Sequence, residues 1–235
     1  VGKKVSNLTF FQNRLGIISD QNLVLSENAS YYNFYATTGT DVLDTDPIDI
    51  AAAGTTVNKL HNSIDFNEQL LLFSGEAQYI LESSGDAVTP TTAVLTKTST
   101  FSHAIKVAPV SAGKYVYFAQ NRNDKTAITE YFADDDTLTN DGLDITVSVQ
   151  SLIPTNCYQL VSNTTEDTLI ALASDTADSQ TAPYTSGTPV SPTHADTMFL
   201  YKYFFDRGEK VQTAWAKWEF SGVKIIGAMS LESYL

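Results

Sequence analysis

Short apolar runs recur in pairs along the chain, and the second run of a pair is often rich in aromatic residues. The four pairs are Leu15–Ser19 with Asn22–Ser26, Leu70–Ser74 with Gln78–Leu81, Tyr115–Phe118 with Ala127–Phe132, and Thr168–Leu172 with Met198–Phe204. Successive pairs start about 45 to 55 residues apart, a period typical of propeller blades and other repeats whose units bury their apolar faces against neighbours. The pattern predicts a scaffold and does not by itself indicate an active site.

The composition of these runs predicts strands. They carry Val, Ile, Tyr, Phe or Thr and are bounded by Ser, Asn, Asp or Gly, which is typical of strands joined by turns. Asp20–Gln21 and the link at Gly75 are short enough for hairpins. One short helical turn is expected near Ser148–Leu152, before Pro154. We therefore expect an all-β fold, an irregular propeller-like arrangement of antiparallel hairpins or blades.

Length and charge narrow the classes of function. The 235 residues suffice for one large β domain or two smaller ones. A net charge of −13, from 27 acidic and 14 basic residues, argues against a nucleic-acid grip, because affinity for phosphate comes from Lys and Arg. A surface past which DNA slides would instead be neutral or acidic. No apolar run is long enough to span a bilayer, and Cys157 is expected to be a buried structural residue.

Candidate chemistry is sparse, so we expect no enzyme, no cofactor site and no metal site. The three histidines lack zinc-ligand spacing; they are His61, His103 and His194. The carboxylates Asp46 and Asp49 could serve a glycosidase, but they also suit turns. One acidic segment, defined by Asp134, Asp135, Asp136, Asp141 and Asp144, lacks the calcium-loop pattern. It fits a solvated turn or an acidic face toward a channel.

Aromatic clusters allow two interpretations. The clusters are Phe10–Phe11, Tyr31–Tyr32, Phe34–Tyr35 and Trp215 with Trp218. An exposed aromatic row could bind sugar rings, but large aromatics usually fill the space between sheets, so core packing is favoured, with Phe73 and Trp218 predicted to be buried. Arg14 beside an apolar run is expected to need a carboxylate partner or open solvent.

Several collinear motifs resemble one family. They are Thr9–Ile18, Asn22–Ser26, Tyr31–Tyr35, Asp46–Ala52, Leu70–Leu81, Leu138–Pro154 and Trp215–Phe220. In this order they resemble the tail nozzle proteins (tail tubular protein B) of T7-like short-tailed bacteriophages, from about residue 8 to the end of the chain.

The resemblance implies a structural virion protein of the tail nozzle. It implies a hexameric, propeller-like ring below the tail adaptor (tail tubular protein A), with fibres at its side. Genomic DNA would pass through during ejection without specific binding, and the acidic segment would face the lumen or its rim. Residues 1–235 would form a β-propeller-like portion of a longer chain continuing at both ends. Independently of the resemblance, the apolar residues between Ile225 and Leu235 predict a strand that lacks its partner.

Two alternatives remain open from the sequence. One is a carbohydrate-binding or polysaccharide-degrading tail module, and the other is an unrelated propeller that serves as a protein-interaction platform. The Thr-, Ser- and Pro-rich segment 174–197 is longer than the turn the family suggests. Because it cannot support a packed core, we expect a surface loop, either a tolerated insertion or a contact with a fibre, a neighbouring subunit or the host.

Overall fold

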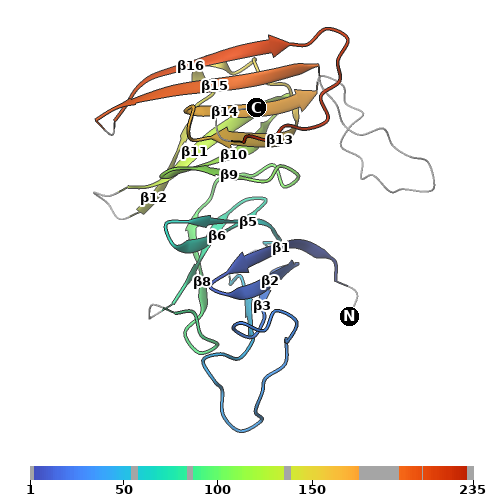
Figure 1. Cartoon of the computed structure of the whole chain (residues 1–235), viewed down its shortest axis with the longest axis vertical. Helices are drawn as coiled ribbons and strands as arrows, with labels where there is room; N and C mark the ends of the chain where they lie inside the picture. The colour runs from blue at the N-terminus through green and yellow to red at the C-terminus, as the bar shows by residue number, and fades with distance from the viewer. Residues whose placement is uncertain are drawn as a thin grey trace, which may run out of the picture. The chain divides into compact units, whose positions relative to one another are not determined.

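The structure, a computed structural model, describes residues 3–53, 58–83, 87–134, 139–174, 196–207 and 209–231. These residues form sixteen strands and one short 3-10 helix, η1 (Val147–Val149), where a helical turn was expected. The strands make four antiparallel sheets of four strands each, and none of these sheets closes on itself. The all-β, blade-like prediction is therefore confirmed (Figure 1).

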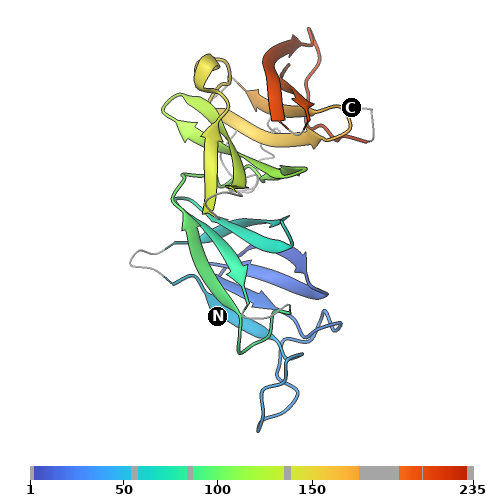
Figure 2. The same cartoon turned by 90° about the vertical axis from the view of Figure 1, so that its left-hand side faces the viewer.

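The chain divides into two compact units. The first comprises Val1–Ile105 and Ala133–Asp141. Its two sheets follow sequence order, and their strands are β1 (Val5–Phe11), β2 (Arg14–Ser19), β3 (Asn22–Leu25), β4 (Ile48–Ala51), β5 (Leu60–Phe66), β6 (Gln69–Ser74), β7 (Gln78–Glu82) and β8 (Val94–Ser99). Strands β1 and β2 contact β5, and β4 contacts β8. The two sheets lie next to each other in Figure 2, and buried side chains of both, among them Leu25 and Leu72, form one core.

The second unit comprises Lys106–Phe132 and Gly142–Leu235. It holds one complete sheet and most of another, whose strands are β9 (Val110–Ala112), β10 (Tyr115–Arg122), β11 (Lys125–Asp134), β12 (Thr139–Asp144), β13 (Asn156–Asn163), β14 (Thr168–Ser174), β15 (Thr197–Asp206) and β16 (Glu209–Glu219). The β15–β16 hairpin is long, and its pairing runs from Thr197–Glu219 to Asp206–Glu209.

The four predicted pairs of apolar runs are the two central strands of each sheet. They correspond to β2–β3, β6–β7, β10–β11 and β14–β15. Both faces of β6, β7 and β14 are covered, so these central strands read as nearly continuous apolar runs. In β2 and β3 buried and partly buried residues alternate. Every residue of β14 is buried, for example. The outer strands carry more polar residues because part of their surface meets solvent.

Two aromatic predictions differ in outcome. Phe73 is fully buried, as predicted, but Trp218 is 50% exposed. Trp218 lies on the edge strand β16 opposite Met198, where only one neighbouring strand shields it. The prediction of core packing is also wrong for Tyr32 and Tyr35, which are strongly exposed in the loop between β3 and β4.

The C-terminal segment is not the predicted strand. Residues 220–231 lie outside the named strands and cross one face of the sheet β13–β16, where Phe220, Ile225 and Ala228 pack on its buried residues. Tyr158 Oη donates to the Ile225 carbonyl (2.8 Å), and Gln159 forms two hydrogen bonds with the Ala228 main chain. Most of the predicted loop 174–197 lies outside the described residues.

Candidate functional site

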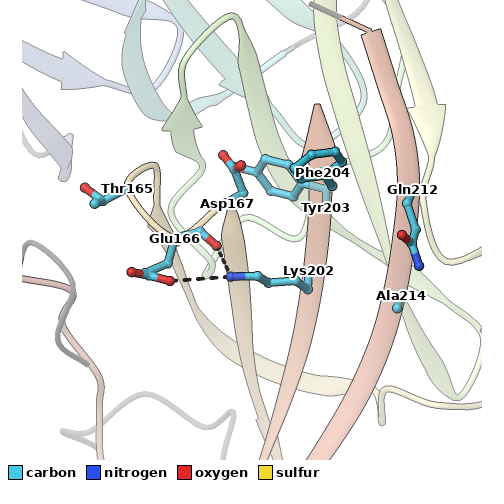
Figure 3. A pocket seen from close by; sticks show the side chains of 8 residues that line it. All are labelled: Thr165, Glu166, Asp167, Lys202, Tyr203, Phe204, Gln212 and Ala214. Atoms are coloured by element: carbon cyan, nitrogen blue, oxygen red, sulfur yellow. Dashed lines mark hydrogen bonds and ion pairs between the residues drawn. The ribbon is translucent and has the colours of Figure 1, made fainter. Parts of the chain in front are cut away.

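A pocket of about 310 Å³ opens on one face of the sheet β13–β16. Its lining comes from the β13–β14 turn and from the middle of the β15–β16 hairpin (Figure 3). The lining residues are Thr165, Glu166, Asp167, Lys202, Tyr203, Phe204, Gln212 and Ala214. All of them belong to the second unit. Lys202 pairs with Ala214, and Phe204 pairs with Gln212, across the hairpin.

The turn that forms one wall of the pocket is held by hydrogen bonds. The Asn163 side-chain oxygen accepts from the backbone N–H groups of Thr165 and Glu166, both at 3.0 Å. The Tyr203 N–H donates to the Asp167 carbonyl (3.0 Å) and so fastens the turn to β15. Asp167 has a φ of 48°, in the left-handed region that Asp tolerates better than most residues. The wall is therefore fixed before any ligand arrives.

The charges in the pocket do not balance. Lys202 Nζ donates to the Glu166 carbonyl and lies 3.6 Å from its carboxylate, as the dashed lines in Figure 3 show. The half-buried Asp167 carboxylate forms no ion pair with any residue in the described ranges. Phe204, which also lines the pocket, is 57% exposed. The pocket thus offers one surplus negative charge and an aromatic surface.

A second constellation lies on the opposite face of the hairpin, where the Lys210 ammonium is surrounded by aromatic rings. Its Nζ lies 4.5 to 5.7 Å from five ring centroids, close enough for cation–π attraction. The rings belong to Tyr115, Tyr117, Tyr201, Tyr203 and Phe205. Because Tyr115 and Tyr117 lie on β10, the lysine joins two sheets of the second unit. We call Lys210, these rings and Glu130 the lysine clasp.

Glu130 completes the lysine clasp. Its carboxylate pairs with Lys210 and accepts a hydrogen bond from the Tyr117 hydroxyl (2.7 Å). The side chains of Lys210 and Glu130 are only 13% and 6% exposed. Burial lowers the pKa of Lys210 although Glu130 opposes this shift. Burial and the nearby Glu130 carboxylate raise the pKa of Tyr117 above its usual range.

The acidic segment is only partly within the described residues. Asp135 and Asp136 lie outside them, as does the side chain of Asp134. Asp141 is exposed on β12. Asp144 is held locally: its carboxylate lies 2.7 Å from Arg122 Nη1 and accepts hydrogen bonds from the Thr146 N–H and hydroxyl. The charge of Asp144 is therefore balanced, and the channel-facing role of the segment stays a prediction.

Arg14 organises the loop between β3 and β4. The residue is 1% exposed, and its guanidinium donates to the carbonyls of Ser26 (2.8 Å), Asp44 (2.7 Å) and Asp46 (2.7 Å). The Asp46 carboxylate in turn accepts from the N–H groups of Thr37 and Leu43, which lowers its pKa. The direct hydrogen-bond partners of Arg14 are thus main-chain oxygens. Burial lowers the pKa of Arg14, and the nearby carboxylates of Glu27 and Asp46 oppose this shift.

Sequence reasoning missed the lysine clasp. A signal was present in the sequence, because aromatic residues recur at every second position in two segments and so share one face of each strand. These residues are Tyr115 and Tyr117 in one segment and Tyr201, Tyr203 and Phe205 in the other. Among the described residues no group of three or more His, Cys, Asp or Glu could hold a metal ion. Within the same residues there is also no helix with the length and apolar character needed to cross a membrane.

Comparison with known proteins gives three findings. A family model described as bacteriophage nozzle protein matches residues 1–235. The tail tubular protein gp12 of Escherichia phage T7 is 31% identical over 237 residues, covering 99% of this chain and 27% of that protein. The chain thus spans about a quarter of the length of this curated relative. A quinonprotein alcohol dehydrogenase-like protein from Bacteroides thetaiotaomicron VPI-5482 is 14% identical, with a TM-score of 0.45 over 95% of this chain and 55% of that one, a likeness too weak to support a comparison.

Proposed function

We propose that this chain, which belongs to the bacteriophage nozzle protein family, forms part of the wall of the tail nozzle in a short-tailed bacteriophage. The family match over the whole chain carries the proposal. The protein would be located in the tail of the virion and would conduct the genome during ejection. We propose a structural role without catalysis, and the descriptions of the family as a nozzle protein and of the relative as a tail tubular protein support this role.

The fold supports a role as a rigid part of the nozzle wall that bears mechanical load. Each unit packs two sheets, and the lysine clasp joins two sheets of the second unit through a buried ion pair. Tyr117, Tyr201 and Tyr203 of the clasp are buried, and the Tyr117 ring packs on the Tyr203 ring across the two sheets. Separating the sheets would expose these rings to water, which costs free energy, so the clasp resists this separation. A wall that contains DNA moving under pressure benefits from such resistance.

The negative net charge of the chain supports a role as a conduit for DNA. A net charge of −13 disfavours contacts with phosphate, and each such contact would add to a salt-sensitive grip on DNA. We propose that copies of the protein form a closed hexameric ring around an axial channel, below a tail adaptor and beside tail fibres. In this arrangement residues 1–235 are a propeller-like portion, and the acidic segment faces the lumen or its rim.

A conditional deletion tests the proposal. Phage grown without the gene should yield DNA-filled heads whose tails lack the nozzle and do not eject, and a copy of the gene in trans should restore both properties. Negative-stain micrographs and a DNA-release assay with purified particles provide the measurement. Complete tails and normal release from particles that lack the protein would overturn the proposal.

A further inference from the structure

We propose that the pocket between the β13–β14 turn and the β15–β16 hairpin receives an arginine side chain from a neighbouring protein of the assembled tail. The occupied position would lie between the Asp167 carboxylate and the Phe204 ring. This inference rests on the proposed function, since it takes the partner to be a protein of the tail. It adds a specific contact and the chemistry that recognises it.

Charge selects a cation as the occupant. Glu166 is paired with Lys202 (3.6 Å), whereas Asp167 has no ion-pair partner among the residues that the structure describes. One monovalent cation balances the remaining charge. An anionic ligand such as a phosphate would meet a net negative pocket, and a neutral sugar would leave the Asp167 carboxylate without its counter-charge.

Shape and surface select arginine among cations. Phe204 is 57% exposed. A planar guanidinium can stack on an aromatic face while it donates two hydrogen bonds to a carboxylate. Gln212, opposite Phe204 on the hairpin, supplies a further acceptor. The volume of about 310 Å³ is at the lower end of ligand pockets and suits one side chain better than an oligosaccharide.

The site is preorganised, which favours binding. Asn163 and the Tyr203 N–H hold the turn, and Lys202 contacts the Glu166 carbonyl. The partner therefore does not have to order the wall of the pocket, and the entropy cost of binding is reduced.

Photocrosslinking in assembled particles tests the inference. The full-length protein carries Phe204→p-benzoylphenylalanine and is built into phage, which is then irradiated and digested. Mass spectrometry should identify a crosslinked peptide of a tail protein with an arginine next to the crosslink. A second particle carries p-benzoylphenylalanine at Val211, which is similarly exposed on the same hairpin, and should not yield this peptide.

A charge test uses matched variants in the crosslinking background. Asp167→Asn should lower the yield of the crosslink about tenfold, because charge-assisted hydrogen bonds are stronger than neutral ones. Asn also tolerates the left-handed backbone at this position. The exposed Asp206 lies on the same hairpin outside the pocket, so Asp206→Asn should leave the yield unchanged. Exchanging the two charges, by Asp167→Arg with an aspartate in place of the partner arginine, should restore the contact.

Three results would overturn the inference: no crosslink at position 204, a crosslink to a polysaccharide or to a peptide without a neighbouring basic residue, or equal yields from Asp167→Asn and Asp206→Asn. Western blots of the same particles separate this failure from that of the proposed function. If the protein is absent from purified tails, the nozzle role fails. If it is present and the pocket is empty, only the arginine contact fails.

Discussion

The lysine clasp predicts an unequal response to removing its two charges. Lys210→Met removes the ammonium and leaves the Glu130 carboxylate buried, with the Tyr117 hydroxyl as its remaining donor from the clasp. Glu130→Gln instead leaves the ammonium among five aromatic rings. Because the rings stabilise a cation and cannot stabilise a carboxylate, we expect Lys210→Met to be the more destabilising change.

The magnitude follows from burial. Removing one partner of a buried ion pair costs about 3–5 kcal/mol, which we expect for Lys210→Met. In Glu130→Gln the cation–π contacts still stabilise the desolvated ammonium by about 2 kcal/mol. The loss of stability is therefore reduced to about 1–3 kcal/mol. The double variant, with no buried charge in the clasp, should cost less than Lys210→Met alone. Lys202→Met is the matched control on the same hairpin, because its pair with Glu166 is about half exposed and such pairs contribute about 0–1 kcal/mol.

Cys157 provides the assay. It is buried on β13 in the same unit, and burial raises the pKa of its thiol to about 12, so at pH 8 the folded protein should resist alkylation. Mass spectrometry of the peptide that contains Cys157 then reports opening of this unit in the full-length protein. At about 1.4 kcal/mol for each factor of ten, Lys210→Met should accelerate labelling about 100-fold or more. Lys202→Met should accelerate it by less than about fivefold.

Equal labelling rates for Lys210→Met and Lys202→Met would contradict this prediction, because the clasp would then contribute no more to stability than a surface ion pair. A double variant that labels faster than either single variant would also contradict it. That result would mean that the two charges contribute to stability independently of each other.

Three further predictions concern the other elements. Arg14→Met should destabilise the first unit by about 2 kcal/mol or more, because buried carbonyls lose their donor. Limited proteolysis should then cut the loop between β3 and β4. A loop that stays uncut would contradict this role of Arg14. Phe73→Ala should lower the free energy of unfolding by about 3–5 kcal/mol, but Trp218→Ala by only about 0.5 kcal/mol. Denaturant-induced unfolding of the two variants measures both values. Equal decreases would mean that Trp218 is covered in the protein. Replacing Asp134–Asp136 with lysine should slow DNA ejection at low salt and less so at high salt, and normal low-salt kinetics from intact particles would place the segment away from the channel.

Central strands that are buried on both faces could be predicted from the sequence, because such strands consist of consecutive apolar residues. Apolar runs such as Leu70–Ser74 and Thr168–Leu172 fall on β6 and β14. Outer strands such as β12 and β16 were not predicted, since a solvent-exposed edge accepts polar residues that also occur in loops. The same ambiguity misplaced Trp218, whose large apolar ring suggested a core position although it lies on an edge strand.

The candidate sites were harder to predict because they depend on pairing between distant segments. Lys210 and Glu130 are 80 positions apart, and nothing local indicates that they meet. Asp167 and Phe204 share a pocket only because β14 pairs with β15. Arg14 was recognised as unusual beside its apolar run, but its main-chain acceptors lie on a loop whose course the sequence pattern does not specify.

The nozzle role can be tested by a cryo-electron microscopy reconstruction of purified virions. We expect this chain to fit density in the tail nozzle, repeated around the axis as a closed ring of six copies with a channel wide enough for duplex DNA. A position outside the tail, or in the tail but away from the channel wall, would exclude this role.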